Sequence, residues 1–324
     1  MQAKGFGVEP RKTLQETIIA SEMPGANLEI PFTIVSGSKP GPTLAVTAGI
    51  HGSEYCAIVA AHKLAKELSP NDLNGTVAIV PLVTRSAFEN RTRWVNPMDG
   101  VNPNRAFPGK LEGSISYQIA YHIFNEVISK SDAYVDMHGG DLMESLTPHA
   151  LFNETGRSEV DQISEKMATS FGVKYVWRIP KEERGTGNAF TEASFAGIPS
   201  MLSEVGEDGK LDSDNVRIQY DGILNVMRVL GILEGGAGPK STPMVSNRGK
   251  FLTTKRGGVF YAYTKTGDVV RQDQLIGEIK SLGGETLEEI RAPFDSVVLA
   301  IVNNPAVKKS DITFEILSVQ PSDN

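Results

Sequence analysis

Two short apolar segments constrain the fold more than any other feature of the sequence. Thr43–Ala48 (TLAVTA) and Thr76–Val83 (TVAIVPLV) are nearly continuously hydrophobic, as expected of strands covered on both faces. Between them, Ala57–Leu68 carries apolar residues at helical spacing. Ala133–Met137 and Ile198–Ser203 read as two further strands. This alternation predicts an α/β protein with a largely parallel sheet.

The sequence changes character in its last quarter. Up to residue 233 the helical pattern continues, with Gln118–Ile128 and Ile223–Leu233 as two further predicted helices. Residues 235–247 (GGAGPKSTPMVSN) then read as a linker. Short strands with frequent turns follow it. Because 324 residues are long for one compact core, we predict two domains. An α/β domain covers residues 1–240, and a small all-β module covers residues 241–324.

Composition excludes several classes of partner. The formal net charge is −7 and no long Lys/Arg cluster occurs, which argues against binding to nucleic acid or to an anionic membrane. The apolar stretches are far too short to span a bilayer, and the first residues lack the apolar core of a signal peptide. The single cysteine, Cys56, fits a reducing compartment. We therefore expect a cytoplasmic protein that acts on a small molecule; the quaternary state, including a homo-oligomer, stays open.

Polar residues follow the predicted strands at the edge where parallel α/β sheets bind ligands. His51 and Glu54 follow the first strand, His138 the third and Glu204 the fourth. Two imidazoles and one carboxylate are a ligand set of catalytic zinc, which keeps a position open for water. Glu204 suits the role of a base and acid that does not bind the metal. Asp136 lies on the same strand face as His138 and suits a hydrogen bond that fixes the tautomer of a ligand imidazole.

Each of these residues also has an ordinary structural explanation. An H-x-x-E spacing arises often by chance, and a histidine at a strand end is more often a structural residue than a ligand. Glu204 alone reads as a helix-cap or surface carboxylate, and Asn104 with Arg105 as turn and salt-bridge residues. For His149, which follows a proline, we favour a structural role. Only the joint pattern at one edge of the sheet favours the metal site.

Four motifs in order resemble the succinylglutamate desuccinylase/aspartoacylase family, a branch of the zinc carboxypeptidase superfamily. GIHGSEY resembles the first metal motif, NPNRAFPG the Asn-Arg substrate segment, DMHGG the second metal motif and SEVG the segment with the catalytic glutamate. The resemblance implies a zinc-carboxypeptidase-like α/β/α fold. It also implies one zinc ion per chain, bound by His51, Glu54 and His138, with Glu204 as general base and acid.

The same resemblance implies the residues that hold the substrate. Asn104 and Arg105 bind its carboxylate, and the planar guanidinium of Arg105 suits that geometry. Arg93 matches the arginine that polarises the scissile carbonyl and stabilises the charge that builds on it. Arg91 is close enough in sequence to keep the Arg93 assignment open.

The implied activity is hydrolysis of the amide bond of an N-acyl amino acid. Family members that read an acidic acyl group place an arginine shortly before the catalytic glutamate, whereas Thr191–Pro199 contains none and the nearest upstream arginine is Arg184. A smaller or neutral acyl group such as acetyl is therefore favoured, in the style of relatives that deacetylate N-acetyl-diaminobutyrate. Two alternatives remain: a zinc exopeptidase, carboxypeptidase-like, acting on short peptides, and a non-catalytic binding protein.

The C-terminal segment resembles the barrel-sandwich module of biotinyl and lipoyl carriers, through KTGDVVRQDQLIGEI and IRAPFDSVV. A carrier needs a modifiable lysine at its hairpin tip, and the corresponding SLGGETLE has none. We therefore expect the module to cover or shape the rim of the pocket. Tyr261 and Tyr263 are candidates to reach the substrate, although aromatic residues in strands more often only pack.

Overall fold

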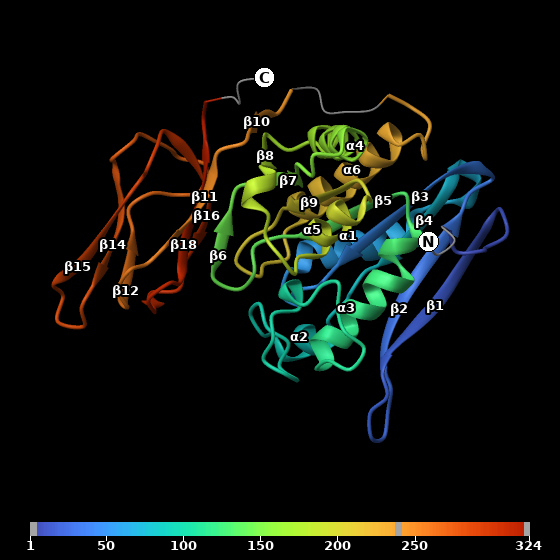
Figure 1. Cartoon of the computed structure of the whole chain (residues 1–324), viewed down its shortest axis with the longest axis horizontal. Coiled ribbons are helices and arrows are strands. Elements are labelled where there is room, and N and C mark those ends of the chain that lie inside the picture. The colour runs from blue at the N-terminus through green and yellow to red at the C-terminus, as the bar shows by residue number, and fades with distance from the viewer. Residues whose placement is uncertain (1–4, 237–241, 321–324) are drawn as a thin grey trace.

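The protein is described by a computed structural model that covers residues 5–236 and 242–320. Its centre is a nine-stranded sheet (Figure 1), in the order β1-β2-β4-β3-β5-β9-β7-β8-β10. The strands are β1 (Lys12–Ser21), β2 (Leu28–Ser36), β3 (Lys39–Ala48), β4 (Asn74–Val80), β5 (Ala133–His138), β7 (His149–Asn153), β8 (Tyr175–Ile179), β9 (Ser200–Glu204) and β10 (Met244–Ser246).

The middle of this sheet is parallel. Strands β4, β3, β5 and β9 run side by side in one direction, and β7 lies antiparallel beside β9. All six residues of β5 are buried, because both faces of the strand are covered. The four strands expected from the apolar segments are confirmed. The N-terminal pair β1 and β2 is antiparallel and was not expected.

Helices cover both faces of the sheet, which confirms the α/β/α class. On one face α1 and α4 both pack on α6; on the other, α3 packs on α5. No helix within the described residues has both the length and the apolar character needed to span a bilayer. The helices are α1 (Tyr55–Glu67), α2 (Arg85–Asn90), α3 (Ile115–Glu126), α4 (Ser158–Ser170), α5 (Ala189–Ala196) and α6 (Ser213–Val229), with 3-10 turns η1 (Pro70–Asp72), η2 (Pro103–Arg105), η3 (Ile128–Lys130) and η4 (Lys181–Glu183).

The expected helix Ile223–Leu233 is the second half of α6, and its predicted bounds were wrong at both ends. The helix begins ten residues earlier, where the Asp212 carboxylate accepts hydrogen bonds from the backbone N–H groups of Asp214 and Asn215, 3.0 and 2.9 Å away. This N-cap satisfies two of the free N–H groups of the first turn. The polar first turn therefore concealed the start of the helix.

The C-terminal part is all-β, as predicted, and consists of two small sheets at one end of the molecule (Figure 1). Strand β6, which precedes β7 in the chain, joins one of these sheets by pairing with β16. The strands are β6 (Glu144–Leu146), β11 (Gly249–Thr253), β12 (Gly258–Ala262), β13 (Val269–Val270), β14 (Leu275–Lys280), β15 (Thr286–Arg291), β16 (Ser296–Val302), β17 (Ala306–Val307) and β18 (Ile312–Ser318).

The boundary at residue 240 stays a prediction, and residues 237–241 of the expected linker lie outside the described residues. Strands cross it in both directions: β6 pairs with β16, and β10 pairs with β8 of the large sheet. Leu299 and Leu317 also share one hydrophobic cluster with Phe190 and Leu202 of the α/β part. Each such buried side chain contributes about 1.5–3 kcal/mol. The module is thereby fixed beside the carboxyl end of β9.

Candidate functional site

The first pair of site residues lies in the turn between β3 and α1. Gly49 has a φ of 64°, a left-handed conformation that glycine adopts without strain. The turn it begins ends where the carbonyl of Glu54 accepts the backbone N–H of Ile58 in the first turn of α1. His51 and Glu54 therefore leave the end of a central strand on a short, buried connection.

His138 is the last residue of β5, the neighbour of β3 in the sheet. The two glycines that follow it allow the chain to pass very close to other backbone. A Cβ at Gly139 would lie 2.4 Å from the carbonyl oxygen of Val205, and one at Gly140 would lie 2.3 Å from that of Glu144. Only glycine fits at these two positions, so the DMHGG motif sets the path of the chain beside His138.

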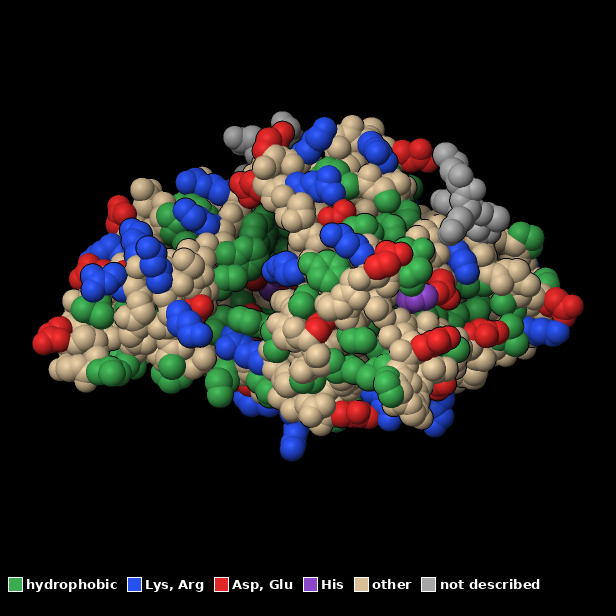
Figure 2. Space-filling model, turned by 60° about the horizontal axis from the view of Figure 1, so that its bottom comes forward, with side chains coloured by type: hydrophobic (Ala, Val, Ile, Leu, Met, Phe, Trp, Pro, Cys, Tyr) green, Lys and Arg blue, Asp and Glu red, His purple; other side chains and the backbone are tan. Residues whose placement is uncertain are grey.

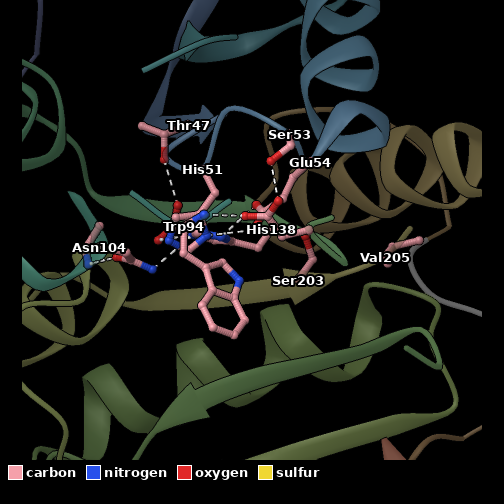
Figure 3. Close-up of polar contacts among 12 residues, drawn as sticks. Thr47, His51, Ser53, Glu54, Trp94, Asn104, His138, Ser203 and Val205 are labelled. Carbon is pink, nitrogen blue, oxygen red and sulfur yellow. Dashed lines mark hydrogen bonds and ion pairs between the residues drawn. The ribbon is translucent and has the colours of Figure 1, made fainter. Parts of the chain in front are cut away.

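His51, Glu54 and His138 meet at one point (Figure 3). The Nδ1 atom of His51 lies 2.7 Å from Oε1 of Glu54, and Nδ1 of His138 lies 2.9 Å from Oε2. One ligand atom from each residue lies within 4.8 Å of the other two. The structure thus brings together the three residues predicted to bind a metal, with both Nδ1 atoms turned to the shared carboxylate.

The charges of these three residues depend on one another. Burial opposes ionisation of Glu54, but the two imidazoles outweigh it and lower its pKa to about 2. Burial likewise opposes the charged form of His51 and His138, and the carboxylate of Glu54 outweighs it, so that both imidazole pKa values are raised. A cation bound at this point would compete with protons for the imidazole nitrogens, so metal binding is expected to depend on pH.

The Nε2 atom of each imidazole, on the side away from Glu54, also has a polar neighbour. Nε2 of His51 lies 3.0 Å from Oδ1 of Asn102. Nε2 of His138 lies 3.3 Å from Oδ2 of Asp136, and the hydroxyl of Thr47 donates to the other oxygen of that carboxylate at 3.0 Å. Partners of this kind fix the tautomer and orientation of ligand imidazoles. Asp136 therefore lies where the sequence placed it, whereas Asn102 was missed.

Asp136→Asn is expected to weaken metal binding by roughly 10–100-fold while leaving the fold intact. The amide keeps the volume of the buried side chain but removes the negative charge that orients Nε2–H of His138. Competition with a chromophoric chelator would measure the affinity. Equal affinities of wild type and variant would show that Asp136 has no influence on the metal.

The triad lies in the wall of a cavity of about 220 Å³. Figure 2 shows the molecule hollowed where the C-terminal module meets the α/β part, with hydrophobic side chains on the walls of the hollow. Besides the triad, the cavity is lined by Trp94, Asn102, Asn104, Arg105, Gly139, Glu144, Leu151, Ile179, Asn188, Phe190, Leu202, Glu204, Phe251, Ile312 and Glu315.

Glu204 is the last residue of β9 and lies directly beside two histidines in the sheet. It pairs with His138 of β5 on one side and with His149 of β7 on the other. Burial and the neighbouring carboxylates, Glu54 first among them, raise the pKa of Glu204 well above its ordinary value despite the opposing effect of His138. A cation at the triad would oppose this shift and favour the ionised form of the carboxyl group.

Arg105 and Asn104 line the cavity from the η2 turn. The guanidinium of Arg105 donates to the backbone carbonyl of Asn104 at 2.7 Å and to the side chain of Asn188. Within residues 5–236 and 242–320 it has no carboxylate at ion-pair distance, and burial lowers its pKa. Asn104 accepts the backbone N–H of Ala189 at 3.0 Å, and its Nδ2 lies 3.2 Å from Nε2 of His138.

The structure does not place Arg93 in the wall of this cavity. Its guanidinium stacks on Trp94, 3.7 Å from the ring centre. Its Nε and Nη2 atoms are buried, and no described residue hydrogen-bonds to them. Arg91 is the left-handed C-cap of α2, with φ 52°, and does not line the cavity either. The role of Arg93 therefore stays a prediction that requires its side chain to turn past Trp94.

The expectation about the C-terminal module was right in outline and wrong in the residues. Tyr261 and Tyr263 are 46% and 50% exposed and do not line the cavity; Phe251, Ile312 and Glu315 do. Their strands, β11 and β18, are neighbours in the sheet. No motif marks these three side chains, because they meet the cavity only through the packing of the module.

Comparison with known proteins agrees with this geometry. Residues 40–230 match the family model of the succinylglutamate desuccinylase/aspartoacylase catalytic domain. The N-alpha-acetyl-L-2,4-diaminobutyric acid deacetylase of Halomonas elongata is 30% identical over 278 residues, which are 84% of this chain and 80% of that protein.

Solved structures show the same fold. A succinylglutamate desuccinylase/aspartoacylase from Rhodobacter sphaeroides superposes with a TM-score of 0.85 at 25% identity, over 98% of each chain. The product-bound ectoine utilization protein EutE (DoeB) from Ruegeria pomeroyi also gives 0.85, at 23% identity, over 97% of this chain and 98% of that one. The range matched by the family model contains His51, Glu54, His138 and Glu204, and the resemblance to this family is confirmed. The chain belongs to the succinylglutamate desuccinylase/aspartoacylase family of N-acyl amino acid deacylases.

Proposed function

We propose that the protein is a zinc-dependent hydrolase that cleaves the amide bond of an N-acyl amino acid, giving a carboxylic acid and a free amine. The observation that carries this proposal is the placement of the metal triad, Glu204 and Arg105 around one small cavity. The first can bind a cation, the second can exchange a proton, and the third can bind a carboxylate. These are the three elements that hydrolysis of such a substrate requires.

The donor set suits zinc. Two imidazole Nδ1 atoms and one carboxylate converge from buried positions, and three protein ligands are the usual number in catalytic zinc sites. When bound, zinc would lower the pKa of a coordinated water and polarise a carbonyl group. The protein holds the ligands for this role by Asn102 behind His51 and by Asp136 behind His138.

Glu204 is proposed to move the proton. It lies beside His138 at the end of β9 and lines the same cavity. As a carboxylate it accepts a proton from the attacking water, and as an acid it donates that proton to the departing nitrogen. Burial raises its pKa, which supports the second half of this cycle because a carboxyl group with a raised pKa is better suited to act as an acid.

Arg105 and Asn104 are proposed to hold the carboxylate of the amino acid. A buried guanidinium without a carboxylate partner among the described residues favours an anionic ligand. Asn104 is fixed by the N–H of Ala189 and adds an amide donor beside Arg105. Arg93, once turned into the cavity, is proposed to stabilise the negative charge on the carbonyl oxygen.

We propose acetyl as the acyl group. Arg105 is the only arginine or lysine among the described residues that line the cavity, and it is assigned to the carboxylate of the amino acid, so a second acidic group of the substrate would have no guanidinium or ammonium partner there. The Halomonas elongata relative is named for deacetylation of Nα-acetyl-L-2,4-diaminobutyrate, which supports that compound as the first substrate to test. The one cysteine, Cys56, is buried and unpaired, in keeping with the proposed cytoplasmic location.

The zinc-loaded protein is expected to release amine from Nα-acetyl-2,4-diaminobutyrate faster than from dipeptides of similar size. The cavity of about 220 Å³ suits a small acyl group better than a second amino acid with a charged N-terminus. A discontinuous assay for the free amine, run at equal substrate concentrations, would compare the two classes. Faster turnover of dipeptides would favour the exopeptidase alternative and overturn the proposal.

A further inference from the structure

The cavity wall carries more carboxyl groups than the proposed reaction uses. Four carboxyl groups line the cavity, those of Glu54, Glu144, Glu204 and Glu315, against the single guanidinium of Arg105. The proposed function assigns Glu54 to the metal and Glu204 to proton transfer. Two acidic side chains on the wall are left without a role.

Glu144 already has a hydrogen-bond partner within the protein. Its Oε2 accepts the backbone N–H of Asp141 at 3.3 Å. Burial, followed by repulsion from Glu54, raises its pKa to about 7. Near neutral pH this group is therefore only partly charged. It begins β6 and belongs to the wall near the metal triad.

Glu315 differs from Glu144 in its position in the chain and in its hydrogen bonding. It comes from β18 of the C-terminal module, is 9% exposed and faces the cavity with Phe251 and Ile312. Its Oε1 is buried and has no hydrogen-bond partner within residues 5–236 and 242–320. A buried carboxylate oxygen without a donor is costly, so its presence in a cavity wall points to a ligand that supplies one.

The nearest polar group is the imidazole of His149, which lies at ion-pair distance but makes no hydrogen bond to Glu315. Nε2 of His149 lies 3.3 Å from Oε1 of Glu315, but Nδ1 of the same ring lies 2.8 Å from the carbonyl oxygen of Thr147 and must donate to it. In the neutral ring Nε2 is then an acceptor, and it too lacks a hydrogen-bond partner. Neither Nε2 of His149 nor Oε1 of Glu315 therefore has a hydrogen-bond partner among the described residues.

The position of this pair is fixed by the sheet. His138, Glu204 and His149 are paired neighbours on β5, β9 and β7. Glu315, which faces His149, therefore lies on the side of Glu204 away from the metal triad. A substrate whose scissile bond lies between the triad and Glu204 would direct one of its other groups toward Glu315.

We infer that Glu315 is a specificity-determining residue that binds an ammonium group of the substrate, so that the enzyme prefers N-acyl amino acids with a short cationic side chain. An ammonium has three donors and no acceptor, and it satisfies the carboxylate that the protein leaves without a donor. The inference rests on the proposed function. It adds that the C-terminal module recognises the substrate through the carboxylate of Glu315.

The test compares two compounds of the same shape. Nα-acetyl-2,4-diaminobutyrate carries an ammonium where Nα-acetylnorvaline carries a methyl group. With Glu315→Gln, kcat/KM for the cationic compound is expected to fall roughly 10–100-fold, the value of a hydrogen bond to a charged group. The fall for the neutral compound is expected to be much smaller. Glu315→Asp keeps the charge and is expected to retain part of the preference.

Glu289→Gln is the matched control, because Glu289 lies on β15 of the same module with its side chain 51% exposed. It is expected to leave both rates unchanged. Equal losses for the two compounds in Glu315→Gln would overturn the inference, as would a wild type that does not distinguish them. Such losses are also the result expected if a charged His149 neutralises the carboxylate within the protein.

A second measurement separates this inference from the proposed function. Calorimetry on the zinc-loaded protein compares binding of free 2,4-diaminobutyrate with binding of norvaline and requires no turnover. A preference for the diamine that disappears in Glu315→Gln supports the inference even if no amide is hydrolysed, which would sink the proposed function alone. Equal binding of the two amino acids would sink the inference and leave the hydrolase intact.

Discussion

Glu204→Gln is expected to lower kcat by roughly 10²–10⁴-fold, the usual contribution of a general acid–base residue. The amide has the same volume as the carboxyl group and stays at the end of β9, beside His138 and His149. It cannot accept a proton from water and cannot return one to the leaving nitrogen. Steady-state kinetics on Nα-acetyl-2,4-diaminobutyrate would measure the loss.

Two further observations decide how that loss is interpreted. Metal content and thermal unfolding of Glu204→Gln are expected to match wild type, because Glu204 is not among the three residues of the triad. Glu207→Gln, three residues further along the same loop and outside the cavity wall, is expected to turn over normally. If Glu204→Gln hydrolyses the substrate as fast as wild type, the proposed role of Glu204 is wrong.

Glu54→Gln is expected to abolish stoichiometric zinc binding. Glu54 contacts both Nδ1 atoms of the triad, and its loss removes the only anionic ligand. The affinity should therefore fall by more than the roughly 10–100-fold that loss of an outer partner causes. Elemental analysis after dialysis should find one zinc per chain in wild type and almost none in the variant.

The variant is also expected to change the pKa values of the two histidines of the triad. Burial opposes their charged forms, and Glu54 is the largest of the charges that raise their pKa values, with smaller contributions from Asp141 at His51 and Asp136 at His138. Without Glu54 both pKa values should therefore fall. The matched control is Glu67→Gln, which should hold one zinc. Glu67 lies at the exposed far end of α1, the helix that begins after Glu54, and accepts a hydrogen bond from Tyr220. Full zinc occupancy in Glu54→Gln would place the metal elsewhere.

The sequence predicts the metal triad because its geometry follows from the parallel sheet. His51 and His138 are far apart in the chain, but each follows a buried strand, and β3 and β5 are neighbours. Glu204 follows from the same rule. Asn102 was missed because its role depends on a single hydrogen bond, to Nε2 of His51. The spacing of residues in the sequence does not predict that bond. The direction of the Arg93 side chain, stacked on Trp94, likewise depends on local packing.

The rest of the cavity could not be predicted for a different reason. Phe251, Ile312 and Glu315 reach it only because two parts of the chain share one hydrophobic cluster. A local pattern identifies β11 and β18 as strands but does not show which face meets another domain. The antiparallel pair β1 and β2 was missed because most side chains of β1 are exposed, and its polar composition hides the strand.

The crossing of β6 into the C-terminal module has a mechanical consequence. Glu144, at the start of β6, lies six residues after His138 in the chain, and it pairs with Val302 of the module. Any outward swing of the module would therefore pull directly on the segment that carries one metal-binding imidazole. We therefore expect the module to stay in place when ligands enter the cavity, because displacing it would disturb the position of His138.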